Sequence, residues 1–123
     1  MLVNVKKDQP KIAIGLLSYL PAFHKFAAAQ QEYAWYQADS KRDLLLWQDE
    51  ATHHMTALVG IEEAYHTIVV RLIVVGAEVP RNRRRAVRQV VLDALQQQYP
   101  NQVIMGTMTT QKMITRWRQQ DHG

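Results

Sequence analysis

The 123-residue sequence contains no cysteine. This absence excludes disulfides, a thiolate nucleophile and cysteine-ligated zinc. Long hydrophobic runs are also absent, because no segment approaches the ~18 consecutive apolar residues that span a bilayer. The start of the chain, MLVNVKKDQPK, lacks the apolar core and the small-residue cleavage site of a secretory signal. We therefore expect a soluble, cytoplasmic protein that does not enter a membrane.

Length and composition favour a single domain over residues 1–123. Hydrophobic residues make up 47% of the chain, enough for one core, and no repeat, low-complexity tract or linker interrupts it. The net charge of +4 favours anionic partners in general. Its source is local, because the short segment RNRRRAVR holds Arg81, Arg83, Arg84, Arg85 and Arg88.

Hydrophobic periodicity predicts five strands and four helices. The segment KIAIGLLSYLPAF fits a buried strand as well as a helix; we interpret it as a helix because Ile12, Leu16 and Tyr19 share one helical face, and we expect Pro21 to end or kink it. The other helices are expected over 22–37, from the arginine segment to Gln98, and over 109–120. The strands are expected over 2–6, 43–48, 55–63, 67–75 and 102–105.

This order predicts a mixed sheet. The three runs over 43–75 are separated by short polar turns, which is typical of an antiparallel meander. The last of them, TIVVRLIVV, is apolar on both faces except at Arg71, as in a central strand. Residues 67–105 then form a strand, helix, strand unit long enough for a right-handed crossover. We predict an α+β, three-layer fold in the order β-α-α-β-β-β-α-β-α, with helices on both faces of a mostly antiparallel sheet.

Arginine at the start of a helix is locally unfavourable, because the exposed amides already place partial positive charge there. Arginines directly after a buried strand and the loop GAEVP therefore indicate a compact phosphate ligand, held by amides and guanidiniums together. One alternative is a solvated basic surface. Another is a nucleic-acid interface extended by Lys112, Arg116 and Arg118, although such interfaces usually need a broad basic face with aromatic platforms or a recognition module.

These residues resemble the GNAT N-acetyltransferase superfamily. Its signature is Gln or Arg, two residues, Gly, any residue, then Gly or Ala; the preferred match runs from Arg83 to Arg88, and a second register runs from Arg81 to Ala86. Nearly the whole chain is similar to the RibT proteins, small GNAT members associated with riboflavin operons. The stretches that carry this resemblance are KIAIGLLSYLP at 11–21, LLLWQDE at 44–50, TALVGIEE at 56–63, VVRLIVV at 69–75 and VVLDAL at 90–95.

The resemblance implies a GNAT fold and acetyl-coenzyme A (acetyl-CoA) as cofactor. It implies that backbone groups of Ile73, Val74 and Val75 bind the pantetheine arm, and that Thr109 and Thr110 lie near the other side of the cofactor. Around the pyrophosphate it places Arg83, Arg84, Arg85, Ala86, Val87, Arg88 and Gln89.

Acetyl transfer to an amine needs a base for the amine and often an acid for the departing thiolate. We predict Glu62 and Glu63, at the end of their strand, as the catalytic base, with His66 as a further candidate. Many GNAT relatives use a tyrosine on the final helix as the acid, whereas this sequence has Met113 and Ile114 there. Other candidates for the acid are Tyr19, Tyr65 and Tyr99. We expect no metal site, because the four-residue spacing of Glu62 and His66 loses its meaning in a hairpin.

The resemblance thus implies an acetyl-CoA-dependent N-acetyltransferase of an unidentified small amine, with a link to riboflavin metabolism as one possibility. The first alternative is a catalytically degenerate GNAT-fold module that binds CoA or another phosphate ligand, favoured by the missing tyrosine and by Arg88 in place of a small residue. The second is a nucleic-acid-binding protein that uses the arginine segment. Relatives generally continue beyond the final helix, so strand 102–105 is expected to be an exposed edge that a partner subunit or a disordered tail protects, and a homodimer is one hypothesis.

Overall fold

The computed structural model describes residues 1–5 and 9–122, with side chains to residue 120. The predicted order of strands and helices is confirmed, and two short 3₁₀ turns, η1 and η2, are added to it. The elements are β1 (Leu2–Asn4), α1 (Pro10–Leu17), η1 (Pro21–Phe23), α2 (Phe26–Gln37), β2 (Arg42–Gln48), β3 (Met55–Ala64), β4 (Thr67–Val75), η2 (Arg81–Arg83), α3 (Arg84–Gln98), β5 (Val103–Gly106) and α4 (Gln111–His122). Of the strand predicted over 2–6, residue 6 lies outside the described residues. Among the helices described, none has the length and apolarity that crossing a membrane requires.

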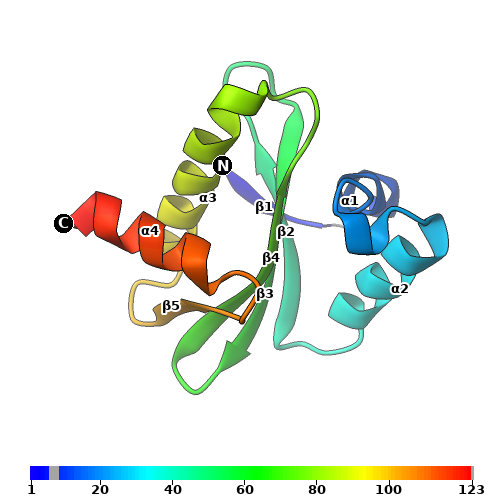
Figure 1. Cartoon of the computed structure of the whole chain (residues 1–123). Coiled ribbons are helices and arrows are strands. Elements are labelled where there is room, and N and C mark those ends of the chain that lie inside the picture. Colours follow the sequence, from blue (N-terminus) through cyan, green and yellow to red (C-terminus); the bar gives the residue numbers. More distant parts are fainter. Residues whose placement is uncertain (6–8, 123) are drawn as a thin grey trace.

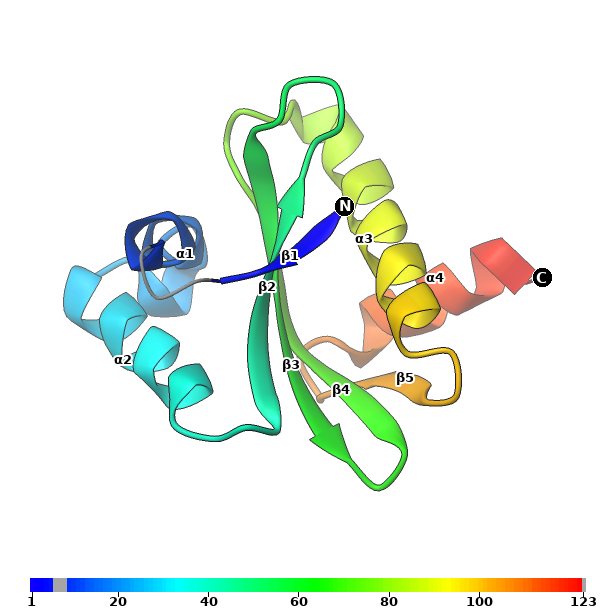
Figure 2. The same cartoon turned by 180° about the vertical axis from the view of Figure 1, so that it is seen from behind.

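A five-stranded sheet with the order β1-β2-β3-β4-β5 forms the middle layer. The first four strands pair antiparallel, and β4 pairs parallel with β5. The helices α1 and α2 cover one face, and α3 and α4 cover the other (Figure 1, and from behind in Figure 2). The predicted three-layer, mostly antiparallel arrangement is therefore confirmed, including the parallel pair on either side of α3.

The first two helices differ from the prediction at their boundaries. We expected the first helix to extend to Pro21, but α1 ends at Leu17. The next turns tighten, because the amides of Tyr19 and Leu20 bond to carbonyls three residues back and the Ser18 hydroxyl bonds to the carbonyl of Gly15. Pro21 then begins η1, so α2 starts at Phe26 and not at the predicted residue 22.

Tyr36 fixes α2 against the sheet. Its side chain is 1% exposed and lies over Gly60 of β3. A Cβ atom at position 60 would lie 2.4 Å from the Tyr36 hydroxyl, so only glycine allows this approach. Because Glu32 precedes Tyr36 by one helical turn, the same contact holds Glu32 on the sheet side of α2.

Strand β4 contains a β-bulge at Arg71. Its neighbours Leu72 and Val70 pair with the consecutive residues Gly60 and Ile61 of β3, which leaves Arg71 as the extra residue. Bulges bend a strand and increase its twist. The bend therefore falls in the middle of β4, at the point where β4 leaves its other neighbour, β5.

Residues 71–75 of β4 form an open edge. β5 pairs with Thr67–Val70 and ends there, and within the described ranges no other strand pairs with 71–75 on that side. Alternate backbone groups of this segment bond to β3, so the others face the space between β4 and β5. This divergence creates a site where an extended molecule can bind β4 as a strand would.

The start of α4 is attached to the same point. The Thr110 hydroxyl donates a 2.6 Å hydrogen bond to the carbonyl oxygen of Val70, the last β4 residue that pairs with β5. The amide of Thr107 donates to the Thr110 hydroxyl at 2.9 Å, and the amide of Gly106 donates to the Gln111 side chain at 2.8 Å. This turn explains why α4 begins at Gln111 and not at the predicted residue 109.

Candidate functional site

Three cavities meet at Ile73 on the open edge of β4, and we call them together the β4 cleft. The arginine cavity, of about 330 Å³, lies between α3 and α4 and is lined by Arg85, Arg88 and Arg116. The loop cavity, of about 250 Å³, is lined by Tyr19, Val74, Val75 and Arg84 as well as Arg88. The glutamate cavity, of about 730 Å³, is lined by Glu32, Arg71, the turn after β5 and Met113. Because all three include Ile73, they follow one line along β4.

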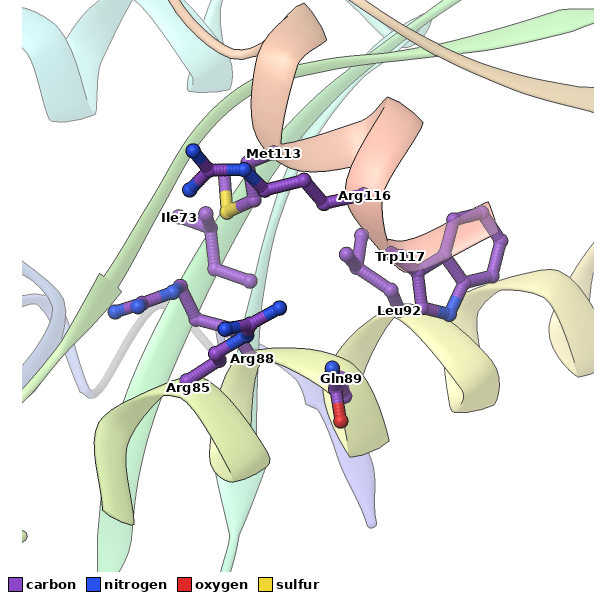
Figure 3. A pocket seen from close by; sticks show the side chains of 8 residues that line it. All are labelled: Ile73, Arg85, Arg88, Gln89, Leu92, Met113, Arg116 and Trp117. Atoms are coloured by element: carbon purple, nitrogen blue, oxygen red, sulfur yellow. The ribbon is translucent and has the colours of Figure 1, made fainter. Parts of the chain in front are cut away.

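The arginine cavity is bounded by two helices that are bonded to each other. The Trp117 indole donates a 2.8 Å hydrogen bond to Asp93, and the side-chain amide of Gln89 donates to that of Gln120. Figure 3 shows Arg85, Arg88 and Gln89 on α3 and Arg116 on α4, with the Arg116 side chain extending toward the side where Ile73 and Met113 lie. The cavity therefore brings together guanidiniums from helices far apart in the sequence.

These arginines carry positive charge that the protein does not neutralise. Among the described residues, none of Arg84, Arg85, Arg88 and Arg116 forms an ion pair with a carboxylate. Burial lowers the pKa of Arg88 from its usual value, and the charges of Arg85 and Arg84 lower it further. Arg84 is also half-buried, and its Nε donates a 3.0 Å hydrogen bond to the carbonyl of Val79 in the loop after β4. Crowded, unpaired guanidiniums at a helix start are the arrangement that binds a phosphate group.

The opposite end of the β4 cleft contains a carboxylate. Glu32 lines the glutamate cavity, and burial raises its pKa above the ordinary value of 4.5, while the nearby charge of Arg71 opposes this effect. Burial and the charge of Glu32 likewise raise the pKa of Tyr36. Glu32 forms no ion pair within the described part of the chain. It is therefore available to a cationic ligand.

Glu62 lies beside this cavity and is engaged by two arginines. It accepts a 3.2 Å hydrogen bond from Arg71 and lies 3.9 Å from the Nε of Arg42. Both guanidiniums stack on Trp35, at 3.9 Å for Arg42 and 4.6 Å for Arg71. Glu63 points elsewhere and accepts a 3.2 Å hydrogen bond from Gln102. Neither glutamate lines the β4 cleft, and their role as the catalytic base stays a prediction.

Most of the residues predicted to bind the cofactor come together in the β4 cleft. Those that line it are Ile73, Val74, Val75, Arg84, Arg85, Arg88, Gln89, Thr109 and Thr110. Arg83, Ala86 and Val87 do not line it: Arg83 is exposed just before α3, and Val87 packs partly against the core. The signature match therefore begins one residue before the helix and continues into its first turns.

From the sequence, Glu32 and Arg71 were not expected in the site, and Arg116 was expected only as part of a nucleic-acid interface. Glu32 lies in a helix whose alanine- and glutamine-rich sequence is typical of a surface helix. The feature that could have indicated its role is its position four residues before Tyr36, which is buried. Arg71 was noted only as an interruption of an apolar strand. Of the tyrosines considered as the acid, Tyr19 lines the loop cavity, whereas Tyr65 is 98% exposed in the turn between β3 and β4.

Comparison with solved structures identifies the class of fold. A probable acetyltransferase superposes with a TM-score of 0.72, at 8% identity over 100% of this chain and 89% of that chain. An aminoglycoside 6′-N-acetyltransferase complexed with coenzyme A superposes with a TM-score of 0.61, at 11% identity over 81% of this chain and 55% of that chain. Together with the mixed sheet and its helices, these similarities show that the chain has the GNAT fold.

The curated sequences similar to this chain include a Bacillus methanolicus protein described as an uncharacterized N-acetyltransferase in the lysA 3′ region. It is 28% identical over 120 residues, which cover 93% of this chain and 92% of the relative. No protein-family model matches the chain.

Proposed function

We propose that the protein is an acetyl-CoA-dependent N-acetyltransferase that acts on a small amine. The observation that carries this proposal is the β4 cleft, in which an open strand edge has unpaired arginines at one end and a carboxylate at the other. The similar N-acetyltransferase from Bacillus methanolicus and the solved relative complexed with coenzyme A support it.

The residues of the cleft fit acetyl-CoA. Its pyrophosphate needs cations, and Arg84, Arg85 and Arg88 have charges that no described carboxylate neutralises. Its pantetheine arm is an extended chain with amide groups, which suits the open backbone edge at residues 73–75. When bound, acetyl-CoA supplies an acetyl thioester, whose carbonyl carbon is reactive toward a neutral amine. The protein's own part is to hold this group along β4 and to bring an amine to it from the glutamate cavity.

The identity of the catalytic groups is part of the proposal. Glu62 and Glu63 are the candidates from the sequence, and Glu62 is connected to the glutamate cavity through Arg71. For the acid, Tyr19 is the candidate that lines the cleft.

A second function has one specific observation in its favour. Met113 of α4 lines both the arginine and the glutamate cavities, and it has no proton to donate to a departing thiolate. A module that binds CoA without turnover would have this arrangement. Nucleic-acid binding is the third candidate, but Arg116 lines the arginine cavity and Arg118 donates to the carbonyl of Ile104, so two cations of α4 are engaged within the fold.

Two finer points belong to the same proposal. The resemblance to RibT proteins makes a riboflavin-pathway compound one candidate acceptor. A homodimer is proposed because β5 is an edge of the sheet and exposes Val103 and Met105, at 56% and 45%. Sedimentation that remains monomeric at all protein concentrations would count against the dimer.

Calorimetric titration of CoA and acetyl-CoA tests the central claim. The wild type should bind both, and an R84A/R85A/R88A variant should bind at least about 100-fold more weakly, because several charge-assisted contacts are lost. Absence of binding to the wild type at millimolar ligand would exclude the first two functions. Binding without acetylation of any amine in a broad panel would favour the module without turnover. Binding of DNA or RNA with a steep salt dependence would favour the third.

A further inference from the structure

We infer that the acceptor is a monoamine with a mainly apolar body, and that Glu32 binds its ammonium group and removes its proton. This inference rests on the proposed function and specifies its acceptor site.

The glutamate cavity is the compartment of the β4 cleft that suits such an acceptor. It is the largest of the three cavities, at about 730 Å³, and it lies between η1 and the start of α4. Its lining is mainly apolar, with Leu20, Pro21, Phe23, Leu72, Ile73 and Met113. A hydrocarbon or aromatic body would be removed from water by these side chains. Because Ile73 is shared with the other two cavities, a ligand in this cavity is adjacent to the open edge of β4.

Glu32 is the carboxylate among the described residues that line the β4 cleft. The nearest candidate to share its role, Glu62, already pairs with Arg71 and lies close to Arg42. The charge of Arg71 acts on Glu32, but Glu32 forms no ion pair in the described structure, so its carboxylate can bond to a ligand. One carboxylate in an apolar cavity selects a ligand with one positive charge.

The glutamate cavity disfavours ligands with several positive charges. Arg71 lines this cavity. A polyamine or an aminoglycoside would have to place further ammonium groups near Arg71, with no second carboxylate among the described residues that line the cleft. The acceptor class therefore differs from that of the aminoglycoside acetyltransferase that shares the fold.

The same carboxylate is suited to receive a proton. An ammonium group has no lone pair, so the amine must lose one proton before its nitrogen can form a bond to carbon. Transfer of that proton from the ammonium to the Glu32 carboxylate leaves a neutral amine and a neutral carboxyl group. Burial raises the pKa of Glu32, which strengthens it as a proton acceptor. Of the elements that line this cavity, β4 contributes the charged Arg71, and the lining residues of η1 and of 107–113 are uncharged.

Binding of matched ligands tests the inference without relying on activity. Phenethylamine and 2-phenylethanol have the same apolar body and differ in the ammonium group, and spermidine is the polycationic comparison. Each is titrated into the protein alone and into the protein saturated with CoA. We expect phenethylamine to bind at least about tenfold more tightly than 2-phenylethanol or spermidine, which corresponds to one charge-assisted contact.

Variants of one glutamate at a time complete the test. E32Q should lose at least about tenfold in phenethylamine affinity and nothing in 2-phenylethanol or CoA affinity, whereas E50Q, which removes the same charge on the exposed turn after β2, should match the wild type. E32D should recover part of the loss. As the pH falls through the raised pKa of Glu32, phenethylamine binding by the wild type should weaken, and binding by E32Q should not.

Three results would overturn the inference. They are equal binding of the amine and the alcohol, an E32Q variant that binds the amine as the wild type does, and tighter binding of spermidine than of phenethylamine. If CoA binds normally while these results are obtained, the acceptor assignment fails and the proposed function stands. If CoA itself does not bind, the proposed function fails.

Discussion

The Thr110 hydroxyl donates a buried hydrogen bond of 2.6 Å to the carbonyl oxygen of Val70, across the point where β4 and β5 separate. Val70 is the last residue of β4 that pairs with β5, so its carbonyl would otherwise face the opening without a strand partner. The side chain of Thr110, the residue before α4, thus ends the parallel pairing in place of a backbone group. The bond gives the Val70 carbonyl a partner at the point where the two strands separate.

The first prediction concerns this bond. T110V removes the donor to Val70 and the acceptor for the Thr107 amide while conserving the shape of the side chain, and it should lower the free energy of unfolding by about 1–3 kcal/mol, because these polar groups lose their partner. Urea denaturation monitored by circular dichroism measures the change. T109V alters the same residue type at the neighbouring exposed position and should stay within about 0.5 kcal/mol of the wild type. Equal stability of the two variants would show that the bond is not important.

The second prediction contrasts two glycines. In G106A the new Cβ would lie 2.6 Å from the amide nitrogen of Gln111 and 2.7 Å from the Thr110 hydroxyl, so the start of α4 must move, at a cost of about 1–3 kcal/mol. In G15A, within α1, the new Cβ meets nothing within 4 Å and should stabilise the helix by about 0.5–1 kcal/mol. Thermal unfolding of both variants should show shifts of opposite sign.

The third prediction separates the arginines that line the cleft from one that does not. R85A and R88A should each weaken CoA binding about tenfold, because each removes a guanidinium from the arginine cavity. R83A removes the same charge from the exposed residue before α3 and should change affinity by less than about twofold. Calorimetry at two salt concentrations measures all three. A larger effect at Arg83 would instead indicate that CoA binds the residues matched by the GNAT signature and not those that line the arginine cavity.

The fourth prediction follows from the raised pKa of Glu32. The folded protein holds this proton more tightly than the unfolded chain does, so the associated stability is present below the ordinary pKa of 4.5 and is lost as the pH rises through the raised pKa. E32Q should therefore be more stable than the wild type at neutral pH and equally stable below pH 4.5. Urea unfolding of both proteins across this range measures the difference. If the stability difference between E32Q and the wild type is the same at every pH, the pKa of Glu32 is not raised in the folded protein.

The fifth prediction compares the three candidates for the base. If acetylation of phenethylamine is measured against pH, E32Q should lose the fall in rate on the acidic side of the profile, whereas E62Q and E63Q should retain it. Glu62 is engaged by Arg71 and Arg42, and Glu63 by Gln102, so neither is directed at the cleft. If E62Q or E63Q instead loses the fall in rate at acidic pH, that glutamate is the base, as predicted from the sequence.

Some elements could be predicted closely, and others could not. The strand predicted for TIVVRLIVV has the same first and last residues as β4, because a β-branched run bounded by turns specifies a strand locally. The start of α2 was missed by four residues, because η1 depends on how the chain turns after Pro21. The start of α4 was missed because Thr110 bonds to Val70, forty residues earlier in the chain.

By itself, the sequence determined the order of strands and helices, the two-sided core and the arginine segment after β4, because hydrophobic periodicity and clustered charge are local properties. Only the tertiary structure decided which charges share a site. Glu32, Arg71, Arg88 and Arg116 come from four elements, and the bulge at Arg71 and the divergence of β4 from β5 bring them along one cleft. Sheet register and helix packing set these distances, and neither is encoded in the spacing of residues along the chain.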